Sequence, residues 1–139
     1  MKIIAVIGLP GSGKSYYLDK FKNNPDYIII DDPKNISEIP VDVDKNILIA
    51  DCHLCRKEVL NSFKQVINKI LPKHSIELIF FENNPNQCLK NVEYRNDGRK
   101  VEATIIQYSK KYEIPEGEKV IPIFNTELLT KKRKNKNSL

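Results

Sequence analysis

The stretch Gly8-Leu9-Pro10-Gly11-Ser12-Gly13-Lys14-Ser15 decides the fold of this chain, because it matches G-x-x-x-x-G-K-[ST] at every fixed position. Residues 2–7, before it, form an apolar run rich in β-branched side chains, which predicts a buried parallel strand. Residues 16–21, after it, can continue as a helix. A strand, a glycine-rich loop and a helix start are the context in which this pattern binds phosphate. The alternative is a simple Gly/Ser turn between a strand and a helix.

The loop residues predict the chemistry of the site. Glycines allow successive backbone N–H groups to point at a phosphate. Lys14 can reach the β- and γ-phosphates of ATP, and the Ser15 hydroxyl can take a place on Mg²⁺. The residues expected to bind the nucleotide are Gly8, Pro10, Gly11, Ser12, Gly13, Lys14 and Ser15. We therefore expect ATP and Mg²⁺ at this loop.

Length and composition indicate one globular domain of 139 residues, with 40% hydrophobic and 29% charged residues. No apolar run approaches the ~18 residues of a membrane helix and no signal peptide is recognisable, so we expect a cytoplasmic protein without a membrane partner. The net charge is +5, and five basic residues lie in the last nine, 131–139. The body at 1–125 is therefore expected to be near neutral, and 126–139 to be a basic tail. Such a tail is either solvated and disordered or attracts nucleic acid.

Five apolar runs predict strands, at residues 2–7, 27–30, 46–50, 76–81 and 119–124. Apolar side chains at three- and four-residue steps predict helices at about 54–71 and 101–111. Strands that alternate with helices favour an α/β fold, with a five-stranded, mainly parallel sheet and helices on both faces. Ligands of such sheets bind beyond the carboxyl ends of the strands.

Acidic residues follow three of the predicted strands at this edge. Asp31 and Asp32 end the second strand, where a carboxylate can deprotonate an acceptor hydroxyl or can simply form a turn before Pro33. Asp51 ends the third strand, where it can hold Mg²⁺ through water or cap the long helix. The fourth strand ends in residues 82–84, Glu-Asn-Asn.

Two arginines form a second candidate group. Arg95 and Arg99 lie four residues apart between the fourth strand and the next helix, within a predicted lid at about 83–100. Guanidinium groups can bridge the oxygens of a phosphoryl group in transfer. The alternative is a solvated basic turn, since Asp-Gly at 97–98 is a common turn pair.

Three cysteines do not suggest a disulfide framework. Cys52-His53-Leu54-Cys55 is similar to half of a zinc site, for which Cys88 and His74 are the other candidate ligands. The alternative is a set of reduced thiols near the end of a strand.

Together these residues resemble phage-type polynucleotide 5′-kinases, which have the same loop form, a paired Asp after the second strand and a lid with two arginines. The resemblance covers short islands within about residues 1–112. It implies the P-loop kinase fold, with Asp31 as the general base toward the 5′-hydroxyl and Arg95 and Arg99 as contacts of the ATP phosphates. Lys14, Asp31, Arg95 and Arg99 are therefore the predicted catalytic residues, and Ser15 and Asp51 the predicted metal ligands.

The chain departs from that family in the acceptor region. Ile30 stands where the family has an Arg before the paired Asp, and Lys34 is the nearest candidate for a second acceptor-binding Arg. Only residues 31–45 separate the second and third strands, whereas the family's segment is several times longer. We thus expect phosphoryl transfer from ATP to a hydroxyl, foremost a polynucleotide 5′-hydroxyl. The alternatives are a nucleotide or small-metabolite kinase and an ATP-binding regulatory module without efficient turnover.

Overall fold

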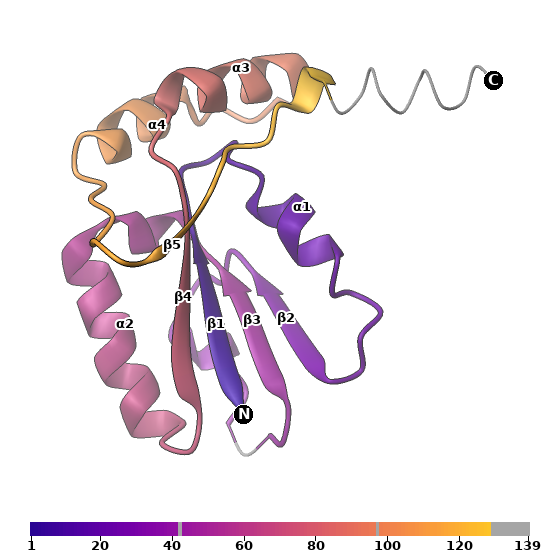
Figure 1. Cartoon of the computed structure of the whole chain (residues 1–139), viewed down its shortest axis with the longest axis vertical. Helices are drawn as coiled ribbons and strands as arrows, with labels where there is room; N and C mark the ends of the chain where they lie inside the picture. Colours follow the sequence, from indigo (N-terminus) through magenta and orange to yellow (C-terminus); the bar gives the residue numbers. More distant parts are fainter. Residues whose placement is uncertain (42, 97, 129–139) are drawn as a thin grey trace.

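The computed structural model describes residues 1–41, 43–96 and 98–128 (Figure 1). Its five strands are β1 (Lys2–Ile7), β2 (Tyr27–Asp31), β3 (Asn46–Ala50), β4 (Ser75–Phe81) and β5 (Lys119–Ile121). Its α-helices are α1 (Lys14–Asp19), α2 (Lys57–Ile70), α3 (Pro85–Arg95) and α4 (Glu102–Ser109). Short 3₁₀ turns, η1 (Ile36–Glu38) and η2 (Cys52–Cys55), precede β3 and α2.

The strands form one parallel sheet in the order β2-β3-β1-β4-β5, so the predicted sheet is confirmed. β1 lies at its centre, where Ile3 pairs with Ile47 of β3 and Ile76 of β4. The five residues of β1 after Lys2 are buried, which explains their continuous apolar run. Because the central strand ends directly at Gly8, the sheet places the glycine-rich loop at the middle of its carboxyl edge.

Alternate residues of the strands pack into two cores, one on each face of the sheet. Ile3 and Ile47 belong to the core that α2 covers with Phe63 and Ile67. Leu48 and its neighbours pack on the opposite face against Leu18 of α1. Helices therefore lie on both faces, as the sequence predicts, and Figure 1 shows α1 and α2 on opposite sides of the strands.

The helix boundaries differ from the prediction at two places. The long helix begins at Lys57 rather than near residue 54, because Asp51 caps the η2 turn and its carboxylate accepts a hydrogen bond from the His53 N–H. Helix α3 was not predicted. It begins at Pro85 after Asn84, whose side chain accepts from the N–H of Gln87, which is a strong start signal.

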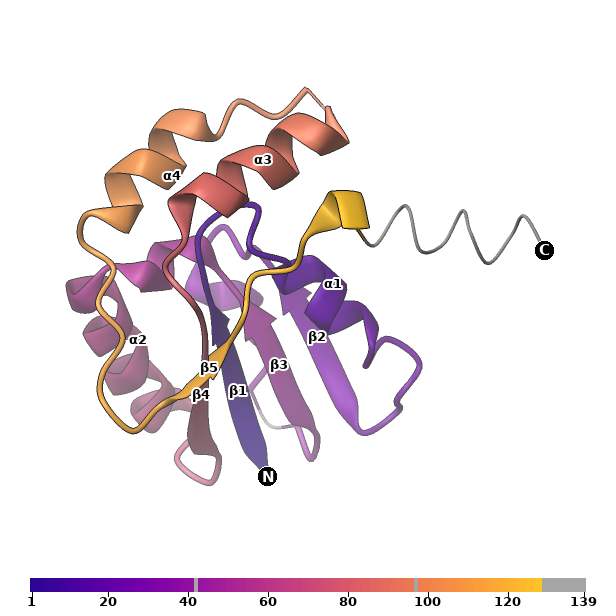
Figure 2. The same cartoon turned by 45° about the horizontal axis from the view of Figure 1, so that its top comes forward.

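α3 and α4 lie over the carboxyl ends of the strands, above the glycine-rich loop (Figures 1 and 2). β5 ends at Ile121 instead of 124, since Pro122 has no N–H to donate to a strand pair. The chain then runs along the loop, where the Phe124 N–H lies 3.4 Å from the Ser12 carbonyl oxygen. Of the predicted basic tail at 126–139, residues 126–128 are helical and residues 129–139 lie outside the described residues. In the described part of the chain, no helix is long and apolar enough to cross a membrane.

Candidate active site

The glycine-rich loop is packed from two sides, which fixes its shape. Gly11 and Gly13 have φ angles of 82° and 105°, which L side chains rarely adopt. A Cβ on Gly11 would lie 2.7 Å from the Cys88 carbonyl oxygen, and one on Gly13 would lie 2.3 Å from the Phe124 ring. Helix α3 and the segment after β5 therefore leave no room for side chains at these positions.

Asn91 of α3 ties these parts together, and sequence reasoning missed it. Its side chain is 1% exposed. Its Nδ2 donates to the carbonyl oxygens of Gly11, at 2.8 Å, and Phe124. Its Oδ1 accepts from the Thr126 N–H at 3.1 Å and from Gln87 Nε2 at 3.0 Å. One amide thus connects α3, the loop and the C-terminal segment.

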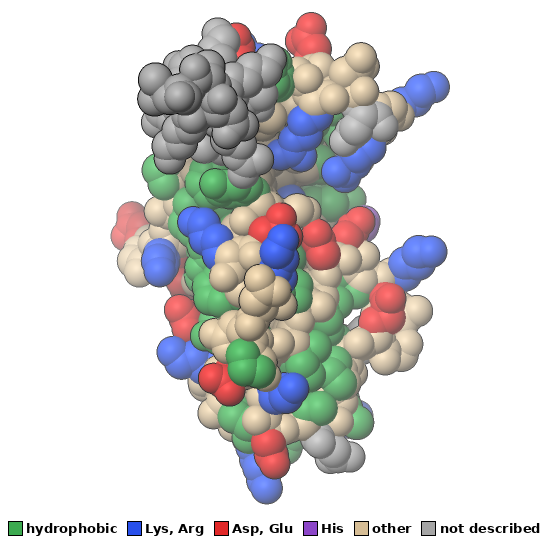
Figure 3. Space-filling model, turned by 90° about the vertical axis from the view of Figure 1, so that its right-hand side faces the viewer, with side chains coloured by type: hydrophobic (Ala, Val, Ile, Leu, Met, Phe, Trp, Pro, Cys, Tyr) green, Lys and Arg blue, Asp and Glu red, His purple; other side chains and the backbone are tan. Residues whose placement is uncertain are grey.

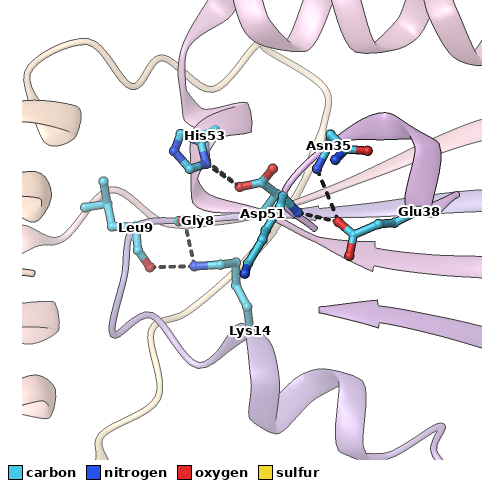
Figure 4. A network of polar contacts seen from close by, with 8 residues as sticks. Gly8, Leu9, Lys14, Asn35, Glu38, Asp51 and His53 are labelled. Atoms are coloured by element: carbon cyan, nitrogen blue, oxygen red, sulfur yellow. Dashed lines mark hydrogen bonds and ion pairs between the residues drawn. The ribbon is translucent and has the colours of Figure 1, made fainter. Parts of the chain in front are cut away.

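Lys14 folds back on its own loop (Figure 4). Its Nζ donates to the carbonyl oxygens of Gly8 and Leu9, both at 2.8 Å. Burial lowers the pKa of the Lys14 ammonium, and the negative charge that the three cysteines and Asp31 can carry opposes this shift. The side chain is half-buried and can exchange these carbonyls for phosphate oxygens.

Ser15 and Asp31 form an oxygen pair beside the loop, with Ser15 Oγ donating to Asp31 Oδ2 at 2.7 Å. Asp31 closes β2 opposite Ala50 of β3, which brings the ends of the two strands together. Asp32 follows with φ 54°, and its N–H donates to the Ala50 carbonyl oxygen at 2.8 Å. The sequence predicts Ser15 and Asp51 as the Mg²⁺ ligands and Asp31 as the base, whereas the contact observed here joins Ser15 to Asp31, whose oxygen atoms are also of the kind that Mg²⁺ prefers.

Asp51 caps the η2 turn and not the long helix, as the alternative prediction had it, because α2 begins only after Arg56. Its Oδ1 accepts from the His53 N–H at 3.0 Å and lies 2.8 Å from His53 Nδ1 (Figure 4). The carboxylate is nevertheless at the wall of the same cavity as Ser15 and Asp31. Capping and metal binding therefore compete for one side chain.

A cavity of about 360 Å³ is lined by most of the residues that are predicted to bind ATP or to act in catalysis. Its walls include Pro10, Gly11, Gly13, Lys14, Ser15, Asp31, Asp32, Asp51, Arg95 and Arg99. Figure 3 shows basic side chains on the upper part of the molecule facing acidic side chains across a hollow. Gly8 and Ser12 do not line the cavity. The Ser12 hydroxyl oxygen is buried and has no hydrogen-bond partner among the described residues.

The arginines come from α3 and from the turn that follows it. Arg95 is the last residue of α3, and Asn96 ends the helix with φ 47°. Arg99 stands two residues before the Val101 cap of α4. Asp97, between them in the predicted lid, lies outside the described residues. Because α3 also packs on Gly11, the position of Arg95 is linked to that of the loop.

The residues after β4 have structural roles. Glu82 Oε1 accepts from the Ile123 N–H at 3.1 Å, and Asn83 Nδ2 donates to the carbonyl oxygens of Ser109 and Tyr112. Asn84 caps α3. These side chains hold α3, α4 and the C-terminal segment on the sheet and do not line the phosphate cavity.

A second cavity, of about 560 Å³, adjoins the first and was not predicted. Asp32 and Asp51 belong to the walls of both cavities. Its apolar walls come from three segments and comprise Pro33, Ile39, Ile49, Leu54, Val59, Phe63 and Val66. Lys34 and Arg56 add positive charge, and the Arg56 guanidinium also lies 5.5 Å from the centre of the Tyr108 ring. A hydroxyl-bearing molecule in this cavity would meet the phosphate site at the two carboxylates.

The zinc alternative is wrong in the form that the sequence suggested. His74 is buried beside Lys45, whose carbonyl oxygen lies 3.1 Å from His74 Nε2. Burial raises the pKa of the Cys55 and Cys88 thiols to about 12, which is expected for inert buried cysteines. Neither these cysteines nor His74 belongs to a group of three or more candidate ligands in the described part of the chain.

A search of protein-family profiles gives no match to this chain. The chain is 37% identical over 121 residues to the uncharacterized protein R277 of Acanthamoeba polyphaga mimivirus, covering 81% of this chain and 87% of the viral protein. The chain belongs to the family of this viral protein. This relationship covers most of the chain and assigns no activity.

Two solved structures show the fold of this chain. A gluconokinase from Sinorhizobium meliloti 1021 superposes with a TM-score of 0.61 at 15% identity, covering 98% of this chain and 94% of that protein. A fungal RNA kinase superposes with a TM-score of 0.52 at 13% identity, covering 89% of this chain and 75% of that protein. The chain therefore has the P-loop kinase fold, as the glycine-rich loop and the alternation of strands and helices predict.

Proposed function

We propose that this protein is an ATP-dependent kinase that transfers the γ-phosphoryl group to a hydroxyl. One observation carries the proposal. A single cavity brings together the phosphate loop, two arginines and three carboxylates, and it meets a second cavity at Asp32 and Asp51. The fold that the chain shares with a gluconokinase and an RNA kinase supports the same reaction class.

The chain's residues have distinct roles in this reaction. Lys14 leaves its carbonyl partners and binds the β- and γ-phosphates, together with the N–H groups of the loop. Arg95 and Arg99 bind the oxygens of the transferring group, whose charge is most dispersed in the transition state. Ser15, Asp31 and Asp51 would hold Mg²⁺, which neutralises phosphate charge when it is bound.

The transfer itself needs a carboxylate on the acceptor side. The acceptor oxygen attacks the γ-phosphorus, the bond from that phosphorus to the β,γ-bridging oxygen breaks, and ADP leaves with the electron pair. The acceptor proton passes to the base. We predict from the sequence that Asp31 is this base, but its Oδ2 already accepts from Ser15 and it does not line the second cavity. Asp32 lines both cavities and is better placed for the role.

A polynucleotide 5′-hydroxyl is our first candidate acceptor. Its support is the arrangement of loop, paired Asp and lid arginines, which is similar to that of phage-type polynucleotide 5′-kinases. Lys34 and Arg56 beside the second cavity suit an acceptor that carries phosphates. In this candidate the terminal nucleoside occupies the second cavity and the following phosphates lie toward these cations.

A small-molecule acceptor is the second candidate, because one observation favours it. The second cavity, at about 560 Å³, lies within the range of roughly 300–1,000 Å³ typical of small-ligand sites and has mainly apolar walls. Such walls suit a hydroxyl compound with a flat apolar body better than they suit a polyol, whose hydroxyls would lose hydrogen bonds with water.

Transfer of label from γ-labelled ATP to a panel of acceptors tests the proposal. The panel contains a 5′-hydroxyl oligonucleotide, a nucleoside 3′-phosphate, free nucleosides and sugar acids. Labelling of the oligonucleotide above all others supports the first candidate, and labelling of free nucleosides alone supports the second. ATP binding with no labelled product would instead support a regulatory module and would overturn the kinase proposal.

Comparison of Asp31→Asn with Asp32→Asn then assigns the base. A general base contributes ~10²–10⁴-fold to turnover, so the variant that lacks it should lose that factor while its ATP affinity is unchanged. The variant that lacks only a metal ligand should instead need more Mg²⁺ for half-maximal rate. We expect the first pattern for Asp32→Asn and the second for Asp31→Asn. The reverse result would assign the base to Asp31.

A further inference from the structure

Four side chains of different chemistry gather where β2 and β3 end. They are the carboxylates of Asp32 and Asp51, the Cys52 thiol and the His53 imidazole, and one ligand atom of each lies within 4.8 Å of those of all the others. No other group of three or more candidate ligands occurs in the described part of the chain. We propose that these four residues form a binding site for a borderline divalent cation of the Zn²⁺ class.

The spacing of the ligand atoms is close to what such a cation needs. Zn–O, Zn–N and Zn–S distances of about 2.0–2.3 Å place the ligands of a tetrahedral ion roughly 3.3–3.8 Å apart. Side-chain rotation can close the difference from 4.8 Å, since Asp32 and His53 are exposed and Asp51 and Cys52 are half-buried. Three of the ligands are consecutive residues, the cap and first two residues of the η2 turn, and Asp32, just after β2, is held beside them by the hydrogen bond from its N–H to the Ala50 carbonyl oxygen.

Asp51 and His53 are already in direct contact. His53 Nδ1 lies 2.8 Å from Asp51 Oδ1, and this contact orients both side chains. A cation bound between them takes the place of the shared proton. At Cys52 the cation displaces the thiol proton, because cysteine binds metals as the thiolate.

The ligand types determine which cation is selected. Mg²⁺ requires an octahedral set of oxygen atoms, whereas thiolate and imidazole favour Zn²⁺ and Co²⁺. The site therefore shares Asp51 with the proposed Mg²⁺ ligands but does not include Ser15 or Asp31. It also differs from the zinc site suggested by the sequence, because two carboxylates from the strand ends take the place of Cys55, Cys88 and His74.

Occupation of this site has a consequence that rests on the proposed function. Asp51 lies in the wall of the phosphate cavity and Asp32 lies between the two cavities. A Zn²⁺ ion that binds both carboxylates removes them from Mg²⁺ and from the acceptor. We therefore expect Zn²⁺ to inhibit phosphoryl transfer, and acceptor or Mg²⁺–ATP to oppose its binding.

Titration of the full chain with Co²⁺ tests the site without any assay of activity. A thiolate bound to Co²⁺ gives a charge-transfer band in the near ultraviolet, and tetrahedral Co²⁺ gives intense visible bands. We expect both, at one Co²⁺ per chain and with displacement by Zn²⁺ but not by equimolar Mg²⁺. Absence of the charge-transfer band, or a Co²⁺ affinity no higher than that for Mg²⁺, would overturn the proposal.

Matched variants identify the ligands. Cys52→Ser should remove the charge-transfer band, whereas Cys55→Ala, in the same turn, and Cys88→Ala, on α3, should retain it. His53→Gln and Asp32→Asn change exposed side chains and should fold normally. Each of these two variants should weaken Co²⁺ binding by at least about tenfold. Loss of a residue that only orients a metal ligand already lowers metal affinity by about 10–100-fold, and loss of a ligand itself should cost no less. A band that survives in Cys52→Ser and disappears in Cys55→Ala would refute the assignment, whatever the outcome of the kinase assay.

Discussion

Replacement of Asn91 by Ala removes the amide that connects α3, the loop and the C-terminal segment. Three of its partners are main-chain atoms, the carbonyl oxygens of Gly11 and Phe124 and the N–H of Thr126. A net contribution of about 1 kcal/mol for each hydrogen bond gives a loss of about 3 kcal/mol in the free energy of unfolding. For a chain of this size, that loss lowers Tm by about 10 °C. Circular dichroism during heating measures the shift.

Two matched variants show whether the loss of stability in Asn91→Ala comes from the hydrogen bonds that the Asn91 side-chain NH₂ group donates. Asn91→Asp keeps an acceptor for the Thr126 N–H but directs a buried carboxylate at two carbonyl oxygens. Its folded-state pKa should therefore lie above the unfolded value of about 3.9, so the variant should regain stability as the pH falls through the folded pKa. Asn86→Ala, at an exposed site on the same helix, should change Tm by no more than about 2 °C. An Asn91→Ala protein that melts as the wild type does would refute the role of this amide.

Lys14→Ala should abolish measurable label transfer from ATP and leave the fold intact, with Tm lowered by no more than about 7 °C, since it removes two hydrogen bonds worth about 1 kcal/mol each. Arg95→Ala and Arg99→Ala should each lower turnover by about 10²-fold or more, with smaller losses of ADP affinity in calorimetry, and Lys replacements should recover little because an ammonium lacks the bidentate fork. Lys34→Ala should raise the KM for an oligonucleotide acceptor by about fivefold with kcat unchanged, since an exposed charge contributes up to about 1 kcal/mol. Truncation after Thr130 should preserve Tm and ATP binding but weaken oligonucleotide binding, and the log–log salt slope should become shallower by roughly 0.7 for each phosphate that the tail no longer neutralises. Equal losses of ADP affinity and turnover in the arginine variants, or an unchanged salt slope after truncation, would contradict these assignments.

The sheet could be predicted because its signals are local. Each strand contains an apolar run, continuous in β1, β2 and β3, and the glycine-rich loop identifies the central strand and the edge where ligands bind. Because the carboxyl ends of parallel strands lie at one edge of the sheet, the acidic residues after β2 and β3 were expected beside the loop. The structure brings Asp31, Asp32 and Asp51 to one cavity. These relations follow from the parallel order of the strands alone.

Helix α3 escaped prediction because its buried face is not apolar. That face comprises Cys88, Asn91 and Val92, so the spacing of hydrophobic residues gives a weak signal. The buried asparagine is stabilised by main-chain groups up to 80 residues away in the sequence, which no local pattern can reveal. The start signal at Asn84 and Pro85 was present and would have located the helix.

The second cavity was also beyond the reach of sequence patterns. Its walls combine the segment after β2, the end of β3 and one side of α2. Val59, Phe63 and Val66 have ordinary helical spacing, which is typical of core residues. Their contribution to a cavity depends on where Ile39 and Leu54 come to lie, which is set by packing between distant segments.

A single-turnover experiment tests the central claim most directly. Protein in excess over γ-labelled ATP is mixed with Mg²⁺ and a pool of hydroxyl acceptors, with Lys14→Ala as the control. We predict that the label moves from ATP to an organic phosphomonoester in the wild type and stays in ATP in the variant. Label that remains in ATP or appears only as inorganic phosphate in the wild type would contradict the assignment of this site to phosphoryl transfer between ATP and a hydroxyl.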